Sequence, residues 1–310
     1  MRLSLPSFAA VALAATVLVA VPATALGGAS TAADPHPNTY DGTSPAFTMS
    51  PVEFRIGASL DAADPPAAET CAGNPWNLAV PLRLRWSGSD ATSGLAGYDV
   101  WGTGPSFNGV EKLVAATSAT SYNLNGYNYE GDCGGGSEFD RAYWVVSEDN
   151  RGNTASSNLV SPQVDVWQET GKDELGAAGL TVTKTGTWTT ASCSCFNHGK
   201  TLYSTAAGAS LTYKVTVDRP GQTFALVVEK NSNRGTANIS VDGGAATAVN
   251  TQASSPTHRV IVWQKVLSVG THTVKVTNAG TAGHSRVDVD SVLLTVGQGT
   301  SSPPEPQPGL

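Results

Sequence analysis

The densest grouping of reactive side chains is ASCSCFNHGK, residues 191–200, which holds Cys193, Cys195 and His198 within six positions. Cysteine and histidine this close together can bind a metal ion, exchange electrons as a dithiol or form a disulfide. A structural zinc needs four nitrogen or sulfur ligands, and this stretch supplies at most three. A redox dithiol is usually spaced C-x-x-C on a βαβ unit, and neither feature is present.

The remaining interpretation is a disulfide within the stretch. In an extended strand the β-carbons of Cys193 and Cys195 would be too far apart to be bridged, so a bond between them requires a bent loop. Asn197 and Gly199 are residue types that favour such a loop. We therefore predict a loop closed by a Cys193–Cys195 disulfide.

A rigid loop of this kind would display Phe196, Asn197 and His198, an aromatic face with hydrogen-bonding tips that could contact a sugar ring. The alternative is an exposed turn without a ligand. Trp188 is a further candidate for stacking on a sugar, although its alternating apolar neighbours favour core packing.

The first 25 residues have the features of a secretory signal peptide. A short positive start is followed by an apolar stretch at 8–21 and an Ala-Thr-Ala cleavage site at 23–25. No cysteine follows to take a lipid, and the C-terminal residues form no apolar anchor. We expect a secreted, extracellular protein with no membrane span after signal cleavage, and a monomer.

Composition favours β structure and argues against a nucleic-acid partner. Charged residues make up only 14% of the chain, and its net charge is −7. Residues 45–168 carry 14 acidic and 6 basic side chains, whereas residues 169–297 carry 8 and 11. Neither half has the clustered basic face that phosphate binding needs. Thr, Ser and Val fill the periodic segments, and no apolar pattern of period 3.6 predicts a helix after residue 25.

Short alternating segments separated by turn residues organise residues 48–167. In LAVPLRLRW (78–86), Val80, Leu82, Leu84 and Trp86 share one face, which predicts a strand with one buried and one solvent-exposed face. In RAYWVVSED (141–149) both faces are apolar, which predicts a central strand. The other segments expected to be strands are 52–60, 95–102, 120–127 and 158–167. Six or seven short strands in this length suggest a β-sandwich.

WSGSDATSGLAGYDVW (86–101) and AYWVVSEDNRGNTAS (142–156) resemble the fibronectin type III or immunoglobulin-like modules of bacterial secreted proteins. The resemblance implies a spacer or binding module without catalytic residues. Its strand order would place Cys71 and Cys133 in loops at the same end of the sandwich, where a disulfide is geometrically reasonable. Asp90 and Asp149 would fall in two loops at the other end, either as a cation site or as side chains that hydrogen-bond their own turns.

Residues 168–297 contain eight or so alternating segments with short turns, which suggest an antiparallel jelly roll. GASLTYKV, RPGQTFALVVEKNSNRGTANISVDGG, VLSVGTHTVKV and SRVDVDSVLL resemble the galactose-binding-like jelly roll found as a carbohydrate-binding module. The resemblance implies a polysaccharide or cell-wall glycan as partner. The predicted fold class is thus all-β, with an immunoglobulin/fibronectin III-like sandwich at 48–167 and a jelly roll at 168–297, flanked by a disordered lead (26–47) and a disordered Pro-rich tail (298–310).

The same resemblance implies a structural calcium ion (Ca2+) as the cofactor, held by an acid of the first strand and an aspartate of the last. Asp290 in DVDSVLL matches the aspartate, and Glu169 in WQET roughly matches the acid. The departure from the pattern is that Glu169 has no second acid two residues away. The alternative role of Asp290 is to cap a neighbouring turn.

No motif predicts chemistry on a substrate. His272 alternates in phase with Val274 and Val276, which predicts a packed histidine, and the chain has no G-x-S-x-G or H-E-x-x-H motif. We therefore expect a non-catalytic protein that binds glycans or cell surfaces through the jelly roll. The alternative is a structural or adhesive spacer without a sugar ligand.

Overall fold

The computed structural model describes residues 41–60, 79–104, 109–128, 142–161, 163–172 and 179–295. Within them the regular structure is β-strand, apart from one 3-10 turn, η1 (Asn197–Gly199), so the predicted all-β class is confirmed. Cys71 and Cys133, the predicted signal peptide, the lead up to residue 40 and the tail lie outside the described residues. None of the described segments forms a helix long and apolar enough to span a membrane.

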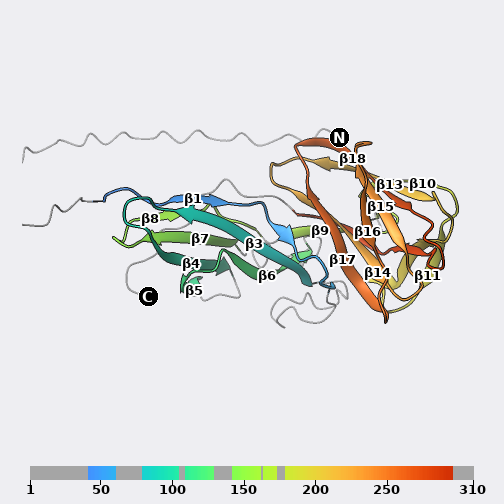
Figure 1. Cartoon of the computed structure of the whole chain (residues 1–310), viewed down its shortest axis with the longest axis horizontal. Coiled ribbons are helices and arrows are strands. Elements are labelled where there is room, and N and C mark those ends of the chain that lie inside the picture. The colour runs from blue at the N-terminus through green and yellow to red at the C-terminus, as the bar shows by residue number, and fades with distance from the viewer. Residues whose placement is uncertain are drawn as a thin grey trace, which may run out of the picture. The chain divides into compact units, whose positions relative to one another are not determined.

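The first half is a sandwich of two antiparallel layers (Figure 1). One layer runs in the order β1-β3-β6, with β2 also paired to β3, and the other runs β5-β4-β7-β8. The strands are β1 (Ala46–Met49), β2 (Glu53–Phe54), β3 (Ala79–Ser89), β4 (Leu95–Gly104), β5 (Gly109–Thr117), β6 (Ser121–Asn128), β7 (Ala142–Asp149) and β8 (Thr154–Ser156).

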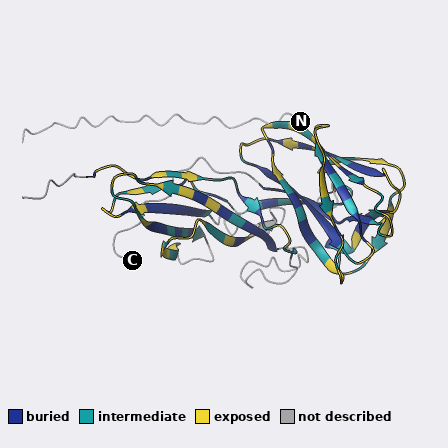
Figure 2. Ribbon diagram, viewed as in Figure 1, coloured by how far each residue is buried: buried dark blue, intermediate teal, exposed yellow. Residues whose placement is uncertain are grey.

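Alternation along β3 places its apolar side chains in the core. Val80, Leu82 and Leu84 are at most 1% exposed, whereas Arg85 faces solvent. Burying each of these aliphatic side chains stabilises the fold by about 1.5–3 kcal/mol. Strand β7 is buried on both faces and lies between β4 and β8, which confirms the prediction of a central strand. Figure 2 shows the same alternation, with dark blue buried bands between teal and yellow ones along the strands.

The second half is an antiparallel jelly roll. A five-stranded sheet runs β10-β13-β18-β15-β16, a three-stranded sheet runs β11-β12-β19, and β20-β14-β17 lie in the remaining sheet. The strands are β10 (Thr181–Thr185), β11 (Thr189–Ser192), β12 (Lys200–Ser204), β13 (Ser210–Val217), β14 (Thr223–Lys230), β15 (Thr236–Val241), β16 (Thr247–Asn250), β17 (Thr257–Val266), β18 (Gly270–Asn278), β19 (Val287–Val289) and β20 (Ser291–Thr295).

One strand joins the two halves. β9 (Gln163–Gln168) pairs parallel with β6 and antiparallel with β20, so a single sheet runs β1-β3-β6-β9-β20-β14-β17. Val227 and Leu293 of the jelly roll pack in the same core cluster as Leu82 of the first half. The boundary predicted at 167–168 therefore falls at the end of a strand that hydrogen-bonds to both halves.

The strands differ from the sequence-based expectation in several places. β1 and β8 were not among the expected segments, and β1 begins at Ala46, inside the segment expected to be a disordered lead. Residues 52–60 contribute only the short β2, because the chain turns at 56–57 and then makes an isolated bridge from Ser59 to Val260. β5 was not expected, and its register against β4 shifts twice, which breaks the period of two. β12 was also missed, because Gly199 and Lys200 interrupt its pattern directly after the disulfide loop.

Candidate ligand-binding groove and buried carboxylates

The disulfide loop connects β11 to β12. Cys193 is bonded to Cys195, with their α-carbons 5.1 Å apart. The backbone closes on itself, since Cys193 N donates to the Gly199 carbonyl at 3.0 Å and Phe196 N donates to the Cys193 carbonyl at 3.1 Å. His198 has φ of 52°, the left-handed region that a tight loop requires of it. The local sequence therefore forms a compact hairpin connection.

The loop does not display all three residues expected of it. Asn197 is only 2% exposed, and its backbone N–H donates to the Asp290 carboxylate at 3.0 and 3.2 Å. This corrects the expectation that Asn197 offers a tip to a sugar. His198 is half-buried, and this burial lowers the pKa of its imidazole. The Phe196 ring lies edge-on to the His258 ring, with 6.1 Å between centroids.

Trp188 and Trp263 pack against the jelly-roll core. Trp188 is half-buried, packs beside the core cluster, and donates its indole N–H to the Thr185 carbonyl at 3.2 Å. Trp263 is 9% exposed and meets Phe224 edge-on. The core role that the alternating neighbours of Trp188 favoured fits its side chain, and Trp263 packs in the same way.

Three buried acids lie near one another beneath the loop. Glu169, Glu229 and Asp290 are 3%, 2% and 0% exposed. Desolvation raises the pKa of each carboxyl, and Glu229 and Glu169 add to the rise at Asp290 because like charges oppose its ionisation. Glu229 contacts His258 Nδ1 and accepts the Arg259 backbone N–H at 3.0 Å. Burial and mutual repulsion therefore oppose the ionisation of these carboxyls.

The donor chemistry of Glu169 and Asp290 fits a calcium ion. Carboxylate oxygens are hard ligands, and Glu169 Oε2 is buried without a hydrogen-bond partner among the described residues. In the described part of the chain, the Asp290 carboxylate accepts hydrogen bonds only from the Asn197 N–H. Within the described chain, no third His, Cys, Asp or Glu joins these two carboxyls at mutual ligand distance, so other ligands would be backbone, amide or water oxygens.

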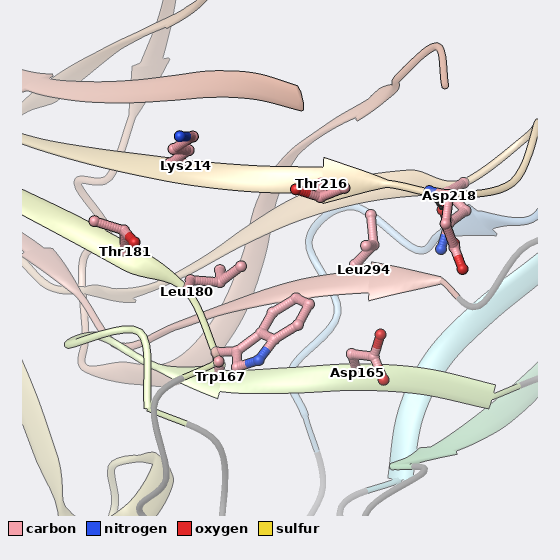
Figure 3. A pocket seen from close by; sticks show the side chains of 10 residues that line it. Asp165, Trp167, Leu180, Thr181, Lys214, Thr216, Asp218 and Leu294 are labelled. Atoms are coloured by element: carbon pink, nitrogen blue, oxygen red, sulfur yellow. Dashed lines mark hydrogen bonds between the residues drawn. The ribbon is translucent and has the colours of Figure 1, made fainter. Parts of the chain in front are cut away.

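A groove of about 390 Å³ opens where β9 and β20 of one sheet face β10 and β13 of the other. Figure 3 shows the Trp167 indole and the Leu180 and Leu294 side chains at its base. Its walls are polar and are formed by Asp165, Thr181, Lys214, Thr216, Asp218 and Gln222. The groove therefore combines an aromatic and aliphatic base with hydrogen-bonding walls.

Strand alternation decides which side chains line this groove. Tyr213, Val215 and Val217 of β13 point into the core and are at most 1% exposed, so Lys214 and Thr216 between them point out toward solvent. Gly179 passes against the indole, and a Cβ there would lie 2.0 Å from Trp167 Nε1. Only glycine permits this approach, which leaves the indole at the base of the groove.

The polar groups of the groove differ in how much of their hydrogen-bonding capacity is already used within the protein. Gln222 is buried and saturated, because its Nε2 donates to the Thr295 carbonyl and its Oε1 accepts two backbone N–H groups. Lys214, Thr216 and Thr181 are exposed. Asp165 is half-buried, and Asp218 lies 4.0 Å from the Arg219 guanidinium. A polar ligand would meet donors and acceptors of both charges.

Sequence reasoning missed this groove. Lys214, Gln222 and Leu294 lie in segments that resemble a carbohydrate-binding module, but nothing in those segments marks them as ligand contacts. The lining residues also come from segments that are far apart in the chain. The available signal was the alternation of SLTYKVTV, which predicts that Lys214 and Thr216 face outward.

His272 was expected to be a packed histidine, and its side chain is only 13% exposed. Its two ring nitrogens contact Asp242 Oδ2 at 2.7 Å and the Ser268 carbonyl at 2.8 Å. Asp242 is the larger cause of the raised pKa of this imidazole, because it stabilises the protonated ring.

Comparison with known proteins gives similarity only among solved structures. No family model matches the sequence, and no curated protein is similar to it. Carbohydrate-binding modules are among the structures it resembles. The family 35 carbohydrate-binding module from Clostridium thermocellum is 16% identical with a TM-score of 0.33, and the match covers 42% of this chain and 98% of that one.

Two further structures are similar over a comparable share of the chain. The CBM35 from Cellvibrio japonicus Abf62 is 14% identical with a TM-score of 0.33, covering 43% of this chain and 92% of that one. The Podospora anserina GH26-CBM35 β-(1,4)-mannanase is 19% identical with a TM-score of 0.33. That match covers 47% of this chain and 30% of the mannanase.

Proposed function

We propose that this is a secreted, non-catalytic protein that binds a saccharide chain in the groove between β9 and β13. The observation that carries the proposal is the composition of the groove, an indole with two leucine side chains under walls of hydroxyl, carboxylate and ammonium groups. A sugar ring has an apolar face of C–H bonds and a rim of hydroxyls, so it needs this combination of surfaces. The volume of about 390 Å³ suits a short stretch of a polysaccharide rather than a large ligand.

The groove favours hydroxyl ligands over strongly charged ones. Lys214 supplies a cation, whereas Asp165 and Asp218 supply carboxylates, so neither sign dominates. A neutral glycan can donate to the carboxylates and accept from the ammonium and threonine groups. Because the rim is exposed, its hydrogen bonds compete with water, and we expect micromolar to millimolar affinity for a single site.

We also propose that a calcium ion binds between Glu169 and Asp290. Bound there, it would neutralise two buried carboxylates whose ionisation the jelly roll otherwise opposes. Its role would be structural, because it would hold the end of β9 to the start of β20 and support the disulfide loop through Asn197.

The proposed binding is tested by retention on insoluble polysaccharides and cell-wall preparations. Lys214→Ala and Thr216→Ala remove exposed groups of the groove, so they should weaken binding without unfolding the protein. Lys184→Ala is the matched control, because Lys184 is an exposed lysine on the neighbouring strand β10 that does not line the groove. Phe196→Ala tests the disulfide loop as the site instead.

Retention that falls about tenfold or more in the Lys214 variant and stays unchanged in the Lys184 variant supports the groove. Retention lost only with Phe196→Ala would move the site to the loop. No retention on any polymer would overturn the glycan proposal, and hydrolysis of a glycan or ester by the purified protein would overturn the non-catalytic one.

A second candidate is a spacer that holds other parts at a distance. The β9–β20 pairing favours it, because strands of both halves share one sheet and stiffen the connection between them. We infer that the first half is an immunoglobulin or fibronectin III-like module. The division into β1-β3-β6 and β5-β4-β7-β8 supports this inference, since such sandwiches distribute seven strands over two sheets in a Greek key.

A further inference from the structure

Three aspartates from three separate segments meet at the end of the first sandwich. Asp41 precedes β1, Asp90 follows β3, and Asp149 ends β7. One carboxylate oxygen of each lies within 4.8 Å of the corresponding oxygens of the other two. Sequence reasoning had paired Asp90 with Asp149 and had missed Asp41, which lies about fifty positions before Asp90.

The turn-capping role expected of Asp90 and Asp149 is confirmed, but it does not use all of their oxygens. Asp90 Oδ1 accepts the N–H groups of Thr92, Ser93 and Gly94 at 2.6–3.0 Å. Asp90 Oδ2 makes none of the hydrogen bonds seen in the described chain. Asp149 Oδ1 accepts two backbone N–H groups, whereas Oδ2 accepts only the Asn153 side-chain amide and keeps a lone pair.

Asp41 is the observation that goes beyond an acidic cluster. Its residue is 8% exposed, and its Oδ1 accepts two hydrogen bonds from Thr43. Its Oδ2 has under 1 Å² of exposed surface and no hydrogen-bond partner in the part of the chain that the structure describes. A carboxylate oxygen removed from water and left without a donor is costly unless a cation or another donor satisfies it.

Within the described ranges, the surroundings provide no side chain that compensates these charges. Among the described residues, no lysine, arginine or histidine forms an ion pair with any of the three.

We propose that Asp41, Asp90 and Asp149 bind a calcium ion. The three Oδ2 atoms supply three of the six to eight oxygens that calcium accepts, and backbone or water oxygens would supply the rest. The variable geometry of calcium suits ligands from three loops. Magnesium demands a nearly ideal octahedron at shorter distances and is reluctant to lose its waters. The ion would tie the chain before β1 to the β3–β4 loop and the β7–β8 turn, where Asn153 already donates to the Asp41 carbonyl at 2.9 Å.

Isothermal titration calorimetry of the chelator-treated full chain tests this site. Asp90→Asn and Asp149→Asn keep an oxygen that can accept the turn hydrogen bonds while removing the charge. Asp99→Asn is the matched control, since Asp99 belongs to the same sandwich and pairs with Lys112 at 2.7 Å. Asp290→Asn separates this site from the one proposed in the jelly roll.

We expect a calcium site with a dissociation constant of roughly 10⁻⁵–10⁻³ M that persists in the Asp290 and Asp99 variants. Asp90→Asn and Asp149→Asn should each weaken it about tenfold or more, with magnesium binding weaker than calcium throughout. In the Asp290 variant, calcium should also slow amide exchange at residues 41–43, 90–94 and 149–153. Asp90 is half-exposed, so its variant remains informative if Asp149→Asn fails to fold.

Two results would overturn the proposal. One is an Asp290 variant that binds no calcium up to about 10 mM, which is well above the weakest extracellular sites. The other is calcium binding that is equal in the Asp90, Asp149 and Asp99 variants. Neither result bears on the groove between β9 and β13, so the calcium site is tested independently of saccharide binding.

Discussion

The Thr223 hydroxyl donates a 2.7 Å hydrogen bond to the carbonyl of Val52, and this bond links the jelly roll to the first sandwich. Thr223 is 1% exposed, so its loss would leave a buried carbonyl without a donor. Thr223→Val keeps the shape and removes the hydroxyl, and we expect it to lower the free energy of unfolding by about 1–3 kcal/mol. Urea denaturation measures this, with the exposed Thr216→Val as control. Equal stability of both variants would contradict the expectation.

The sheet shared through β9 and β20 predicts one cooperative unfolding transition for the two halves. Val166 lies opposite Leu293 in this pairing, and both are at most 1% exposed. Differential scanning calorimetry should therefore show a single peak whose calorimetric and van't Hoff enthalpies agree. Two resolved peaks would mean that the halves unfold separately.

Removing one charge from a buried ion cluster in the jelly roll should lower the free energy of unfolding. The Asp288 carboxylate is 0% exposed and lies 2.7 Å from the Arg234 guanidinium and 2.6 Å from that of Arg286. Asp288→Asn leaves two guanidinium groups without a counter-charge, and we expect a loss of about 3–5 kcal/mol in unfolding free energy. Asp218→Asn is the control in urea denaturation, because its carboxylate is exposed. A loss below about 1 kcal/mol for Asp288→Asn would show that the cluster behaves like a surface ion pair.

The raised carboxyl pKa values should make chelator-treated protein less stable as the pH rises above about 4, the ordinary carboxyl value. The pKa values of Glu169, Glu229 and Asp290 are raised by burial, so the folded chain holds protons that the unfolded chain releases near its ordinary value of about 4. Their contribution is lost as pH rises from that value through the folded pKa. The raised pKa of His272 acts in the same direction, because its contribution is present at low pH and is lost as pH rises through the folded value.

Urea denaturation at several pH values measures this slope, and Asp290→Asn should reduce it. Calcium favours ionised carboxylates, so its stabilising effect should be larger at pH 7 than at pH 5. The lowered pKa of His198 acts in the opposite direction, but it does so equally with and without the Asp290 substitution. A slope that is unchanged in Asp290→Asn would therefore show that Asp290 is already ionised in the folded protein.

Alanine substitutions at two glycines should distinguish the loss of stability caused by a steric clash from the loss caused by backbone strain. A Cβ on Gly235 would lie 2.0 Å from the His284 carbonyl oxygen, whereas Gly208 has φ of 78° and open space around it. We expect Gly235→Ala to cost more than about 2 kcal/mol, because the clash is with backbone. Gly208→Ala should cost about 1 kcal/mol for the left-handed conformation. Thermal melts compare them, and a larger loss for Gly208→Ala than for Gly235→Ala would refute the prediction.

Periodicity predicted most of the fold because local alternation and final burial agree along the strands. The apolar face of β3 and the two-sided burial of β7 followed from their residues alone. β5 was missed because register shifts against β4 break its alternation, and β9 was expected without its parallel pairing to β6. That pairing depends on contacts between the halves, which no local pattern records.

The site was less predictable than the fold. The Cys193–Cys195 linkage could be anticipated from spacing, but the burial of Asn197 depends on Asp290, which lies more than ninety positions away. The groove depends on the close approach of Gly179 to Trp167. The aspartate cluster depends on Asp41 lying beside the distant loops that hold Asp90 and Asp149. Contacts between residues so far apart in the sequence are set by the tertiary structure. Residue types alone indicated only which side chains could take part in a site.

The pairing of β9 with β20 also sets where the chain can be divided. A fragment that begins at residue 168 would lack β9 and leave the hydrogen-bonding groups of Ser291–Thr295 open along one side. An unprotected strand of this kind is a template for another chain, and Val292, Leu293 and Leu294 make it strongly apolar. The jelly roll expressed from residue 168 should therefore aggregate, whereas a fragment that begins before residue 163 keeps its own protecting strand.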